Sequence, residues 1–474
     1  MELSKPLPVR CRKTCRNTAN MNTDFVRLLE KSMGVDRAAA LVAALDQPPV
    51  VSLRLNPAKL AKYSAEASGE TMQPVRWAQE NGLPADGPVT WCRDGVYLSD
   101  KPSFTTDPLF HAGAYYVQEA SSMAIEKLLE YWQPAGQPRL LDLCASPGGK
   151  STHGISLMQR LEREGKITDF LWVANEVIAS RATTLADNLV TWGDPRAVVA
   201  CNDPADFKDL EDFFDVVLVD APCSGEGMFR KDHAAREEWT ADSPAFCAAR
   251  QRRILEDVWP SLRPGGLLVY STCTFNALEN EENVAFIASQ LGANCLLSEH
   301  YYPGEQRGEG FFLAILRKDG EEATAPIRLR KSEKRWPLVK EKLPYGWAAM
   351  PVVLRNKEGL VKAIPQTWDD AITYLEGRLR VLRSGVALGR WKGKDWVPEH
   401  DYALSMGFDA TTCPCIALSL EDALTYLRGG APDLSAHPKG YAVLTYRGFP
   451  LGFAKNLGNR CNNLYPAHLR IRRF

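Results

Sequence analysis

Two cysteines occupy positions where a thiol could take part in chemistry. Cys223 lies in the segment Asp220-Ala-Pro-Cys-Ser-Gly-Glu-Gly and Cys273 lies in Ser271-Thr-Cys-Thr, and each segment directly follows a run of apolar residues. Either cysteine alone is usually a small buried side chain of the core. At the tips of neighbouring parallel strands, about 4.8 Å apart, two thiols would instead face one crevice. The arrangement therefore favours nucleophilic chemistry over a structural role.

A glycine-rich turn lies upstream of both cysteines. It follows the apolar run Leu140–Leu143 and leads into a helical pattern from Lys150 onward. Glycine lets the backbone approach a ligand, and a helix N-terminus presents free N–H groups to it, so this stretch predicts the opening unit of a nucleotide-binding α/β domain. Cys144 stands in place of the first P-loop glycine, and no G-x-G-x-x-G is present. An ordinary strand-to-helix turn is the alternative.

Three acids end successive runs of apolar residues, namely Glu176, Asp203 and Asp220. In open α/β sheets, ligands bind beyond the carboxyl ends of the strands. Glu176 could accept hydrogen bonds from ribose hydroxyls, Asp203 could accept one from an adenine amino group, and Asp220 could meet a ligand ammonium. Each acid alone is explained as well by helix capping. Together with the glycine turn, the three indicate an adenosine-type cofactor.

Strand and helix patterns alternate around these residues. A helix is expected over 121–131 and another over 243–262, the latter ended by Arg263-Pro-Gly-Gly. The alternation predicts an α/β fold with a doubly wound parallel sheet, in which strands 214–220 and 266–271 are neighbours. Strands are expected at 140–144, 170–176, 198–203, 214–220 and 266–271, with closing strands at 295–297 and 311–316.

A thiol beside a methyl donor has a specific use. C5 of cytosine is a poor nucleophile, but a thiolate that adds to C6 creates an enamine-like intermediate whose C5 can accept a methyl group. C5 must then lose its proton, and the thiol must leave by elimination. A second thiol can assist this proton removal and release. Two cysteines beside an adenosine-type cofactor therefore point to cytosine methylation.

Three motifs together resemble those of the RNA cytosine-5 methyltransferases of the Sun/Nop family. The motifs are Leu141-Asp-Leu-Cys-Ala-Ser-Pro-Gly-Gly-Lys-Ser151, Asp220-Ala-Pro-Cys-Ser-Gly225 and Ser271-Thr-Cys-Thr274. Upstream, Arg54-Leu-Asn56 and the stretch 110–118 are similar to further motifs of that family. The tail from Leu451 to Arg470 looks like the C-terminal region of bacterial RsmF-type ribosomal RNA methyltransferases. The resemblance covers most of residues 22–474.

The resemblance implies S-adenosyl-L-methionine as cofactor and small-subunit ribosomal RNA as substrate. By motif match, Cys273 is the nucleophile and Cys223 is the thiol that helps the product leave. DNA cytosine-5 methyltransferases use a Pro-Cys thiol as nucleophile, so Pro222-Cys223 alone would mislead, whereas Thr272-Cys273 favours the RNA enzyme. The implied cofactor contacts are Cys144, Ala145, Ser146, Pro147, Gly148, Gly149, Lys150, Glu176, Asp203 and Asp220.

Composition narrows the class of protein. The chain has 474 residues, 45% hydrophobic and 24% charged, with a net charge of −1, so it lacks the global basic excess common in nucleic-acid binders. It has no apolar run of about 18 residues and no apolar signal core, and we expect no membrane span and a cytoplasmic location. The 12 cysteines are scattered, which suits a reduced chain. Neither of the closely spaced pairs Cys11/Cys15 and Cys413/Cys415 is followed by a second cysteine pair or a histidine cluster at the spacing of a metal-binding motif. We therefore expect no metal site.

Five segments are expected along the chain. Residues 1–21 are expected to be a disordered extension, and Met21 is an alternative start of the chain. Residues 22–108 are expected to form an RNA-facing α+β domain, which begins with a helix that runs from Thr23 and ends at Gly34. The methyltransferase domain is expected at 109–318, a basic linker at 319–349, either solvated or in contact with RNA, and a PUA-like RNA-binding region at 350–474.

The end of the chain is locally basic. From Lys439 to Phe474 there are seven Lys or Arg residues and no Asp or Glu. Aromatic residues are interleaved with them, which favours contact with RNA phosphates and bases over a merely basic surface. These aromatic residues are Tyr441, Tyr446, Phe449, Phe453 and Tyr465.

The chain is thus expected to be a monomeric, cytoplasmic RNA cytosine-5 methyltransferase that acts on ribosomal RNA. It should have a class I methyltransferase (Rossmann-like) fold between a small N-terminal domain and a C-terminal PUA-like domain. Two alternatives stay open: the same reaction on transfer RNA, and an RNA-binding ribosome-assembly factor without turnover. Intact Cys223 and Cys273 argue against the second.

Overall fold

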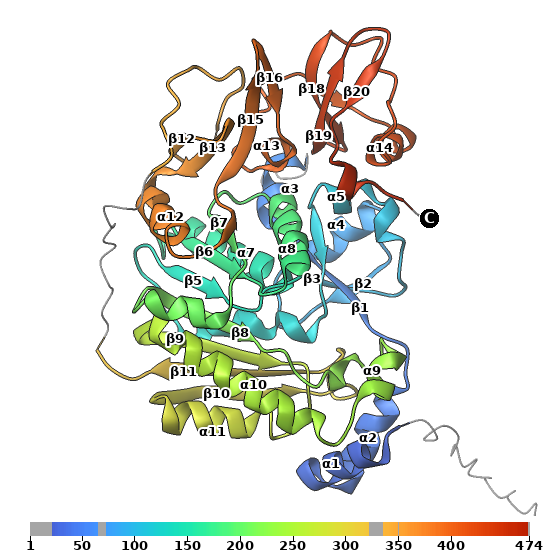
Figure 1. The fold of residues 1–474 in the computed structure, drawn as a ribbon. Helices are drawn as coiled ribbons and strands as arrows, with labels where there is room; N and C mark the ends of the chain where they lie inside the picture. The colour runs from blue at the N-terminus through green and yellow to red at the C-terminus, as the bar shows by residue number, and fades with distance from the viewer. Residues whose placement is uncertain (1–20, 65–72, 322–334, 349, 473–474) are drawn as a thin grey trace, which may run out of the picture.

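The computed structural model describes residues 21–64, 73–321, 335–348 and 350–472. The N-terminal helices lie at one end, a large sheet occupies the centre, and the C-terminal region covers the opposite end (Figure 1). The extension 1–20 and the linker residues 322–334, for which the sequence predicts disorder and basic contacts, lie outside the described residues. Within the described ranges, no helix is both long and apolar enough to span a bilayer.

An eight-stranded sheet forms the centre of the molecule, in the order β10-β11-β9-β8-β5-β6-β7-β14. β5 to β9 pair in parallel, and β10, β11 and β14 add antiparallel pairs at the two edges. The predicted doubly wound α/β sheet is confirmed, with mixed rather than purely parallel pairing. The strands are β5 (Arg139–Asp142), β6 (Leu171–Asn175), β7 (Ala197–Ala200), β8 (Phe214–Asp220), β9 (Leu262–Thr272), β10 (Ala293–Tyr301), β11 (Phe311–Lys318) and β14 (Val381–Arg383).

Helices cover both faces of this sheet because its central strands are apolar on both sides. Leu140 packs with residues of α7 and α8, whereas its neighbour Leu141 packs with residues of α10 and α11. Gly154 lets α7 approach the sheet, since a Cβ there would lie 1.9 Å from the ring of Trp172. The helices are α7 (Gly149–Arg163), α8 (Ala179–Trp192), α10 (Ser243–Val258) and α11 (Glu281–Gln290).

Several predicted boundaries differ from the structure, and the clearest differences lie at 262–266, 121–131 and 293–301. Arg263-Pro-Gly-Gly lies inside β9 instead of ending a helix. The strand begins at Leu262, which pairs with Phe214 of β8, and a shift of register after this pair accommodates the turn-forming residues. The helix expected over 121–131 is a 3-10 helix, η3 (Ser121–Lys127), followed by α6 (Leu128–Tyr131). The strand expected at 295–297 belongs to the longer β10, which pairs with β11 along its length.

The N-terminal region is a helix pair followed by an antiparallel sheet of order β2-β3-β1-β4. Gly34, at φ +83°, ends the first helix as predicted. The buried guanidinium of Arg54 on β1 donates to Thr152 Oγ1 on α7 at 2.7 Å, which holds this sheet against the central domain. The elements are α1 (Thr23–Met33), α2 (Val35–Leu45), β1 (Val51–Leu55), α3 (Pro57–Tyr63), α4 (Pro74–Glu80), β2 (Ala85–Pro88), β3 (Gly95–Leu98), α5 (Pro108–His111) and β4 (Tyr115–Val117).

The C-terminal region contains two further four-stranded sheets, ordered β12-β13-β15-β16 and β17-β18-β19-β20. The second sheet shares an apolar core with the N-terminal region, in which the rings of Trp77 and Phe449 lie 6.5 Å apart. The elements are β12 (Val352–Lys357), β13 (Leu360–Pro365), α12 (Asp369–Glu376), β15 (Val386–Lys392), β16 (Asp395–Pro398), α13 (His400–Leu404), β17 (Cys415–Ala417), α14 (Leu420–Leu427), β18 (Gly440–Tyr446), β19 (Phe449–Asn456) and β20 (Cys461–Asn463).

One piece of the C-terminal region belongs structurally to the central sheet. β14 pairs with β7, with Val381 opposite Ala200. Ile372 and Leu375 of α12 are buried in the same core as β5 and β8. The backbone N–H of Arg380 donates to the side chain of Asn202 at 2.9 Å, so the loop after β7 is held from the C-terminal side.

The turn after α8 is a point where all three regions meet. Asn56 of the N-terminal region donates from its amide to the carbonyl of Trp192 at 3.1 Å. The backbone N–H of Met406 donates to the carbonyl of Gly193 at 2.9 Å. Gly193 has φ +93°, and a Cβ there would lie 2.5 Å from the carbonyl oxygen of Leu404. Only glycine therefore fits at this turn.

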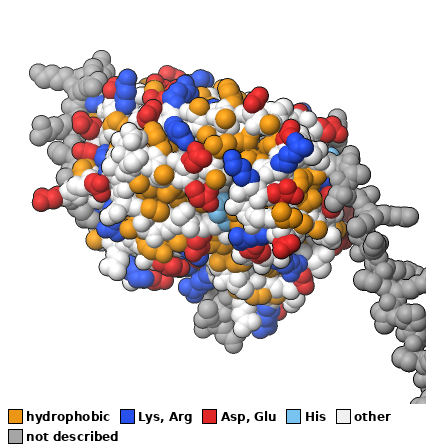
Figure 2. Space-filling view, turned by 90° about the horizontal axis from the view of Figure 1, so that it is seen from below, with side chains coloured by type: hydrophobic (Ala, Val, Ile, Leu, Met, Phe, Trp, Pro, Cys, Tyr) orange, Lys and Arg blue, Asp and Glu red, His pale blue; other side chains and the backbone are white. Residues whose placement is uncertain are grey.

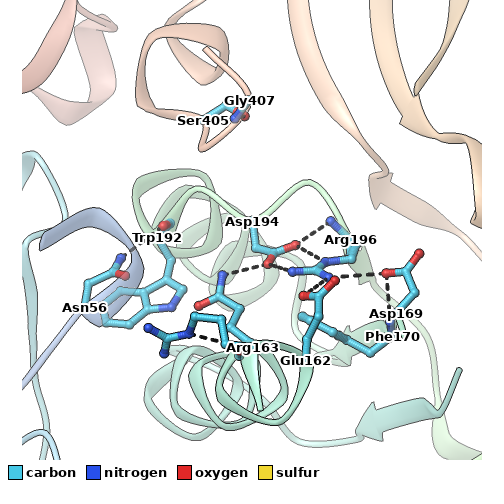
Figure 3. Close-up of polar contacts among 11 residues, drawn as sticks. Asn56, Glu162, Arg163, Asp169, Phe170, Trp192, Asp194, Arg196, Ser405 and Gly407 are labelled. Carbon is cyan, nitrogen blue, oxygen red and sulfur yellow. Dashed lines mark hydrogen bonds and ion pairs between the residues drawn. The ribbon is translucent and has the colours of Figure 1, made fainter. Parts of the chain in front are cut away.

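A buried ion cluster follows the turn directly (Figure 3). Arg196 and Asp194 form an ion pair at 2.8 Å, and both side chains are almost completely buried. Glu162 at 2.7 Å and Asp169 at 3.2 Å contact the same guanidinium. The cluster ties α7 to the strands β6 and β7, because one cation is shared among carboxylates from three segments.

Candidate active site

Cys223 and Cys273 lie together at the carboxyl ends of β8 and β9. The two strands are neighbours, as the sequence predicts, with Asp220 opposite Ser271. The Sγ atoms are 3.2 Å apart, and both side chains are half-buried. Both cysteines line a cavity of about 110 Å³. The two sulfurs are therefore placed to reach the same small group.

A buried hydrogen-bond network fixes the two cysteine segments relative to each other. Glu226 accepts from the backbone N–H of Phe275 at 2.6 Å and from the side-chain amide of Asn276 at 2.9 Å. Glu279 accepts from the backbone N–H of Ser224 at 3.0 Å and from Asn276 at 2.8 Å. Burial raises the pKa of Glu279. The two carboxylates thus bridge the segment of Cys223 to that of Cys273.

Gly227 brings the same segments into backbone contact. Its N–H donates to the carbonyl of Cys273 at 2.6 Å. A Cβ at this position would lie 2.4 Å from that carbonyl oxygen, so a larger residue would push the segments apart. The hydrogen bond with Cys273, followed by burial, raises the pKa of Cys223 well above its ordinary value. Cys223 therefore holds its proton at neutral pH.

A second cavity, of about 190 Å³, lies beside the first at the ends of β5 and β8. The glycine-rich turn forms one wall, and the segment that begins in β4 forms the other. Glu119, Ser122, Lys150 and Asp220 line both cavities, which are therefore adjacent. The residues that line the second cavity are Tyr116, Val117, Gln118, Glu119, Ser122, Asp142, Cys144, Ala145, Ser146, Pro147, Gly149, Lys150 and Asp220.

Hydrogen bonds with α8 fix the conformation of the glycine-rich turn. Gly148 adopts φ +116° just before α7 begins, which glycine tolerates. Asn188 donates from its side-chain amide to the carbonyl of Pro147 at 2.7 Å, and the Ser146 hydroxyl donates to the carbonyl of Arg181 at 3.1 Å. Gly149 and Lys150, the first residues of α7, line the cavity, and the positive end of the helix would stabilise an anionic group of a ligand there.

Asp142 is the most unusual group in the cavity wall. It is completely buried, and its Oδ2 accepts from the Ser151 hydroxyl at 2.7 Å. Its Oδ1 has no hydrogen-bond partner among the described residues. Burial raises the pKa of Asp142 to about 7. A buried acceptor of this kind is costly unless a ligand supplies a donor.

Lys150 and Asp220 form the boundary between the two cavities. The ammonium of Lys150 lies 2.7 Å from Asp220 Oδ2, and the Ser271 hydroxyl donates to Asp220 Oδ1 at 2.8 Å. Burial lowers the pKa of Lys150, but the charge of Asp220, its hydrogen bond with Lys150 and the charge of Asp142 together raise the pKa above its usual value. Lys150 is therefore a permanent positive charge between the cavities.

Glu176 directly follows β6 and Asp203 lies three residues beyond the end of β7, and neither lines either of the two cavities. Glu176 accepts from the backbone N–H of Ile178 at 3.0 Å and forms an ion pair with Arg181 at 3.2 Å. Asp203 caps the short helix η4 (Pro204–Asp209) by accepting from the backbone N–H of Ala205 at 3.1 Å. Both carboxylates thus have local partners, as helix caps do.

Two parts of the site were missed in the sequence. The wall formed by Tyr116, Gln118 and Ser122 comes from β4 and the segment that follows it, and the similarity of 110–118 to a family motif is a signal that could have indicated its first two residues. Asn175 was also missed. Its amide donates to the carbonyl of Leu143 at 3.1 Å and to that of Asn202 at 3.0 Å, which holds the three strand ends together.

The basic tail is placed only partly as predicted. Phe449, Phe453 and Tyr465 are buried in the core, so the prediction that they stack on bases is wrong for these three rings. Lys439 and Arg460 are exposed. On the face seen in Figure 2, basic and acidic side chains are interspersed rather than gathered by sign. On this face, local clusters of charge rather than a field of one sign would therefore attract an anionic partner.

Three family models match successive parts of the chain. Residues 21–120 match the N-terminal domain of 16S rRNA methyltransferase RsmF, and 130–317 match 16S rRNA methyltransferase RsmB/F. Residues 413–471 match the methyltransferase RsmF PUA domain. The matches follow the three regions described above.

Whole-length relatives are also found. Ribosomal RNA small subunit methyltransferase F of Enterobacter sp. (strain 638) is 31% identical over 91% of this chain and 92% of the relative. The protein of the same name from Shewanella oneidensis is 30% identical over 95% of this chain and 97% of the relative. Each comparison spans all three regions.

Solved structures share the fold. NSun6 from Pyrococcus horikoshii, solved with SFG, superposes with a TM-score of 0.52 at 20% identity over 64% of this chain and 99% of the other. A methyltransferase homolog protein from Pyrococcus horikoshii gives a TM-score of 0.50 at 25% identity over 63% of this chain and 100% of the other.

Proposed function

The chain belongs to the family of 16S rRNA methyltransferases RsmB/F, and from that premise we propose that it methylates C5 of a cytosine in small-subunit ribosomal RNA through a covalent thiol adduct. The observation that carries the proposal is the 3.2 Å separation of the Cys223 and Cys273 sulfurs. It is supported by the cavity beside them, which shares four lining residues with that of the thiols.

S-adenosyl-L-methionine is the cofactor of this family, and the second cavity fits it. The unpartnered Oδ1 of Asp142 and the carboxylate of Asp220 suit a ligand ammonium, and the N–H groups at the start of α7 suit a ligand carboxylate. When bound, the cofactor supplies an electrophilic methyl group. The proposed contacts are residues 144–150 with Asp142 and Asp220, and, beyond the cavity lining, Glu176 and Asp203.

Cys273 is proposed as the nucleophile. Attack of its thiolate on C6 forms a C–S bond and makes the electron pair of the C5–C6 double bond available at C5. After methylation, the C5 proton leaves, the electron pair restores the double bond, and the Cys273 thiolate is expelled. The cysteine is therefore regenerated in each turnover.

Cys223 is proposed as the group that receives the C5 proton. Because its pKa is raised, Cys223 holds its own proton before the reaction, and that proton must first pass to solvent. The resulting thiolate is a strong base and can accept the C5 proton. Its proximity to Cys273 also places a proton donor beside the departing thiolate. The buried carboxylates of Glu226 and Glu279 hold both segments in position without contacting the base themselves.

Bisulfite sequencing tests the proposal. Deproteinised small-subunit rRNA and purified subunits are incubated with the enzyme and cofactor, and one cytosine should become resistant to conversion. Cys273→Ala should abolish the signal, whereas Cys247→Ala, which alters a buried cysteine in α10, should preserve it. Resistance that appears in transfer RNA instead would assign the substrate to that class. Binding to ribosomal RNA without resistance in any RNA would favour an assembly factor.

A further inference from the structure

A cysteine, a glutamate and a histidine converge at the contact between the N-terminal sheet and α7. Cys92 lies in the loop before β3, Glu126 in η3 and His153 in α7, and their Sγ, carboxylate oxygen and ring nitrogen lie within 4.8 Å of one another. Cys92 and His153 are 3% and 1% exposed. None of the three lines the cavities of the proposed active site.

The atoms meet at one nitrogen rather than forming a chain. His153 Nε2 lies 3.1 Å from Glu126 Oε1 and 3.8 Å from Cys92 Sγ. A single N–H on Nε2 can be directed fully at only one of these two acceptors. Around a tetrahedral zinc ion with bonds of about 2.0–2.3 Å, neighbouring ligand atoms are separated by roughly 3.3–3.8 Å, which is close to the distances seen.

The glutamate is already oriented for such a role. Its Oε2 lies 3.2 Å from the guanidinium of Arg160, which leaves Oε1 directed at the cluster. Outer partners of this kind commonly fix the orientation of metal ligands. A thiolate and a carboxylate would bring two negative charges together in a buried place, and a divalent cation would neutralise both.

We propose that Cys92, Glu126 and His153 bind a divalent transition-metal ion, with Zn²⁺ as the preferred ion. Thiolate, imidazole and carboxylate are the donor types that zinc takes in proteins. The prediction that the chain has no metal site rested on its closely spaced cysteine pairs. These three ligands form no such motif, because His153 follows Cys92 by 61 positions and Glu126 by 27. The ion would fasten the N-terminal sheet to the helix that begins at the glycine-rich turn.

Metal analysis of the full-length protein tests this site. Protein expressed with zinc and dialysed against a weak chelator should retain about one zinc per chain by mass spectrometry. Replacement by Co²⁺ should produce a thiolate-to-cobalt absorption band in the near ultraviolet. Cys92→Ser and His153→Asn should each reduce the retained metal by roughly tenfold or more.

Matched controls separate this site from adventitious thiol binding. Cys247→Ser removes a different buried thiol, and Cys11→Ser/Cys15→Ser removes a closely spaced pair; both variants should keep the metal. Wild-type protein that retains no zinc and shows no cobalt band would overturn the proposal whether or not the variants fold. Equal metal content in wild type and Cys92→Ser would overturn it as well.

Discussion

The sulfur atoms of Cys223 and Cys273 lie 3.2 Å apart, so each thiol can reach an atom that the other touches. If Cys273 attacks and Cys223 takes up the C5 proton, their variants should fail differently. Cys223→Ala should accumulate RNA bonded to Cys273, because elimination stalls, and the thioether should survive a denaturing gel. Cys273→Ala and the double variant should form no adduct.

Radiolabelled RNA and purified protein provide the readout, with Cys247→Ala as a variant that should turn over normally. A slowly migrating band with Cys273→Ala but not with Cys223→Ala would reverse the two roles, as in the DNA enzymes. Cofactor binding should be close to normal in both single variants, because both thiols act on the RNA.

Cofactor binding should depend on pH through Asp142. Burial raises its pKa from 3.8 to about 7, so the folded chain binds this proton more tightly than the unfolded chain. Its contribution to stability is therefore complete below about pH 4 and declines as pH rises through 7. A ligand ammonium needs the ionised carboxylate, so affinity should rise by up to about tenfold per pH unit between about pH 5.5 and 7.

Calorimetric titration across this range measures the effect. Asp142→Asn keeps the shape of the side chain but cannot ionise, and its affinity should be low and nearly independent of pH. A wild-type affinity that stays constant from about pH 5.5 to 7 would show that Asp142 does not face the ammonium.

Glu176 should contribute to cofactor affinity although it pairs with Arg181 in the structure. Glu176→Ala should weaken binding by about 1–3 kcal/mol, which is the range for removing one partner of a charged hydrogen bond. Arg181→Ala should leave the affinity unchanged or improve it, because it frees the carboxylate. If Glu176→Ala has no effect on the dissociation constant, the residue acts only as a local cap.

The carboxylate of Glu279 should position the thiol segments. The carboxylate of Glu279 accepts hydrogen bonds from Ser224, Gln251 and Asn276. Glu279→Gln replaces one accepting oxygen by an N–H₂ group that also donates, and this change should destabilise the fold by about 1–3 kcal/mol. Turnover should fall with cofactor affinity retained. Glu282→Gln, on the exposed side of α11, is the matched control and should behave like wild type in denaturant unfolding and in single-turnover assays.

Exposed cations of the tail should contribute to RNA affinity by releasing counterions. Replacing Lys439 and Arg460 by alanine should reduce the slope of log affinity against log salt by roughly 1.4 for single-stranded RNA. Lys455→Ala should change the slope less, because its ammonium already lies 2.5 Å from Asp395. Filter binding over a salt series gives the slopes, and identical slopes in all three proteins would exclude a contact at the tail.

Local patterns in the sequence predicted the central sheet well. Apolar runs such as Leu140–Leu143 marked its strands, and the positions of Cys223 and Cys273 after adjacent strands brought the thiols together. These features depend on residues close in sequence and on the rule that ligands bind at the carboxyl ends of parallel strands. The sequence therefore predicted that the two thiols lie together at the carboxyl ends of β8 and β9.

Contacts between distant segments could not be predicted in this way. The wall containing Tyr116 and Gln118 is held against α7 by Arg54 of β1, which donates to both Gln118 and Thr152. Phe453 lies in a regular strand among basic residues, and only the packing of the second C-terminal sheet shows that its ring is buried. Local periodicity does not record which faces meet in the tertiary structure.

Strand β14 has a consequence for the order in which the protein is made. It pairs with β7, and Val381 lies opposite Ala200. Ala200 is synthesised 181 residues before Val381. Until residue 383 has been synthesised, β7 is an open strand edge and Asn202 lacks the backbone of Arg380. The nascent chain therefore completes its central sheet only after Cys223 and Cys273 have long been translated, and premature termination before β14 yields a chain with an unprotected sheet edge.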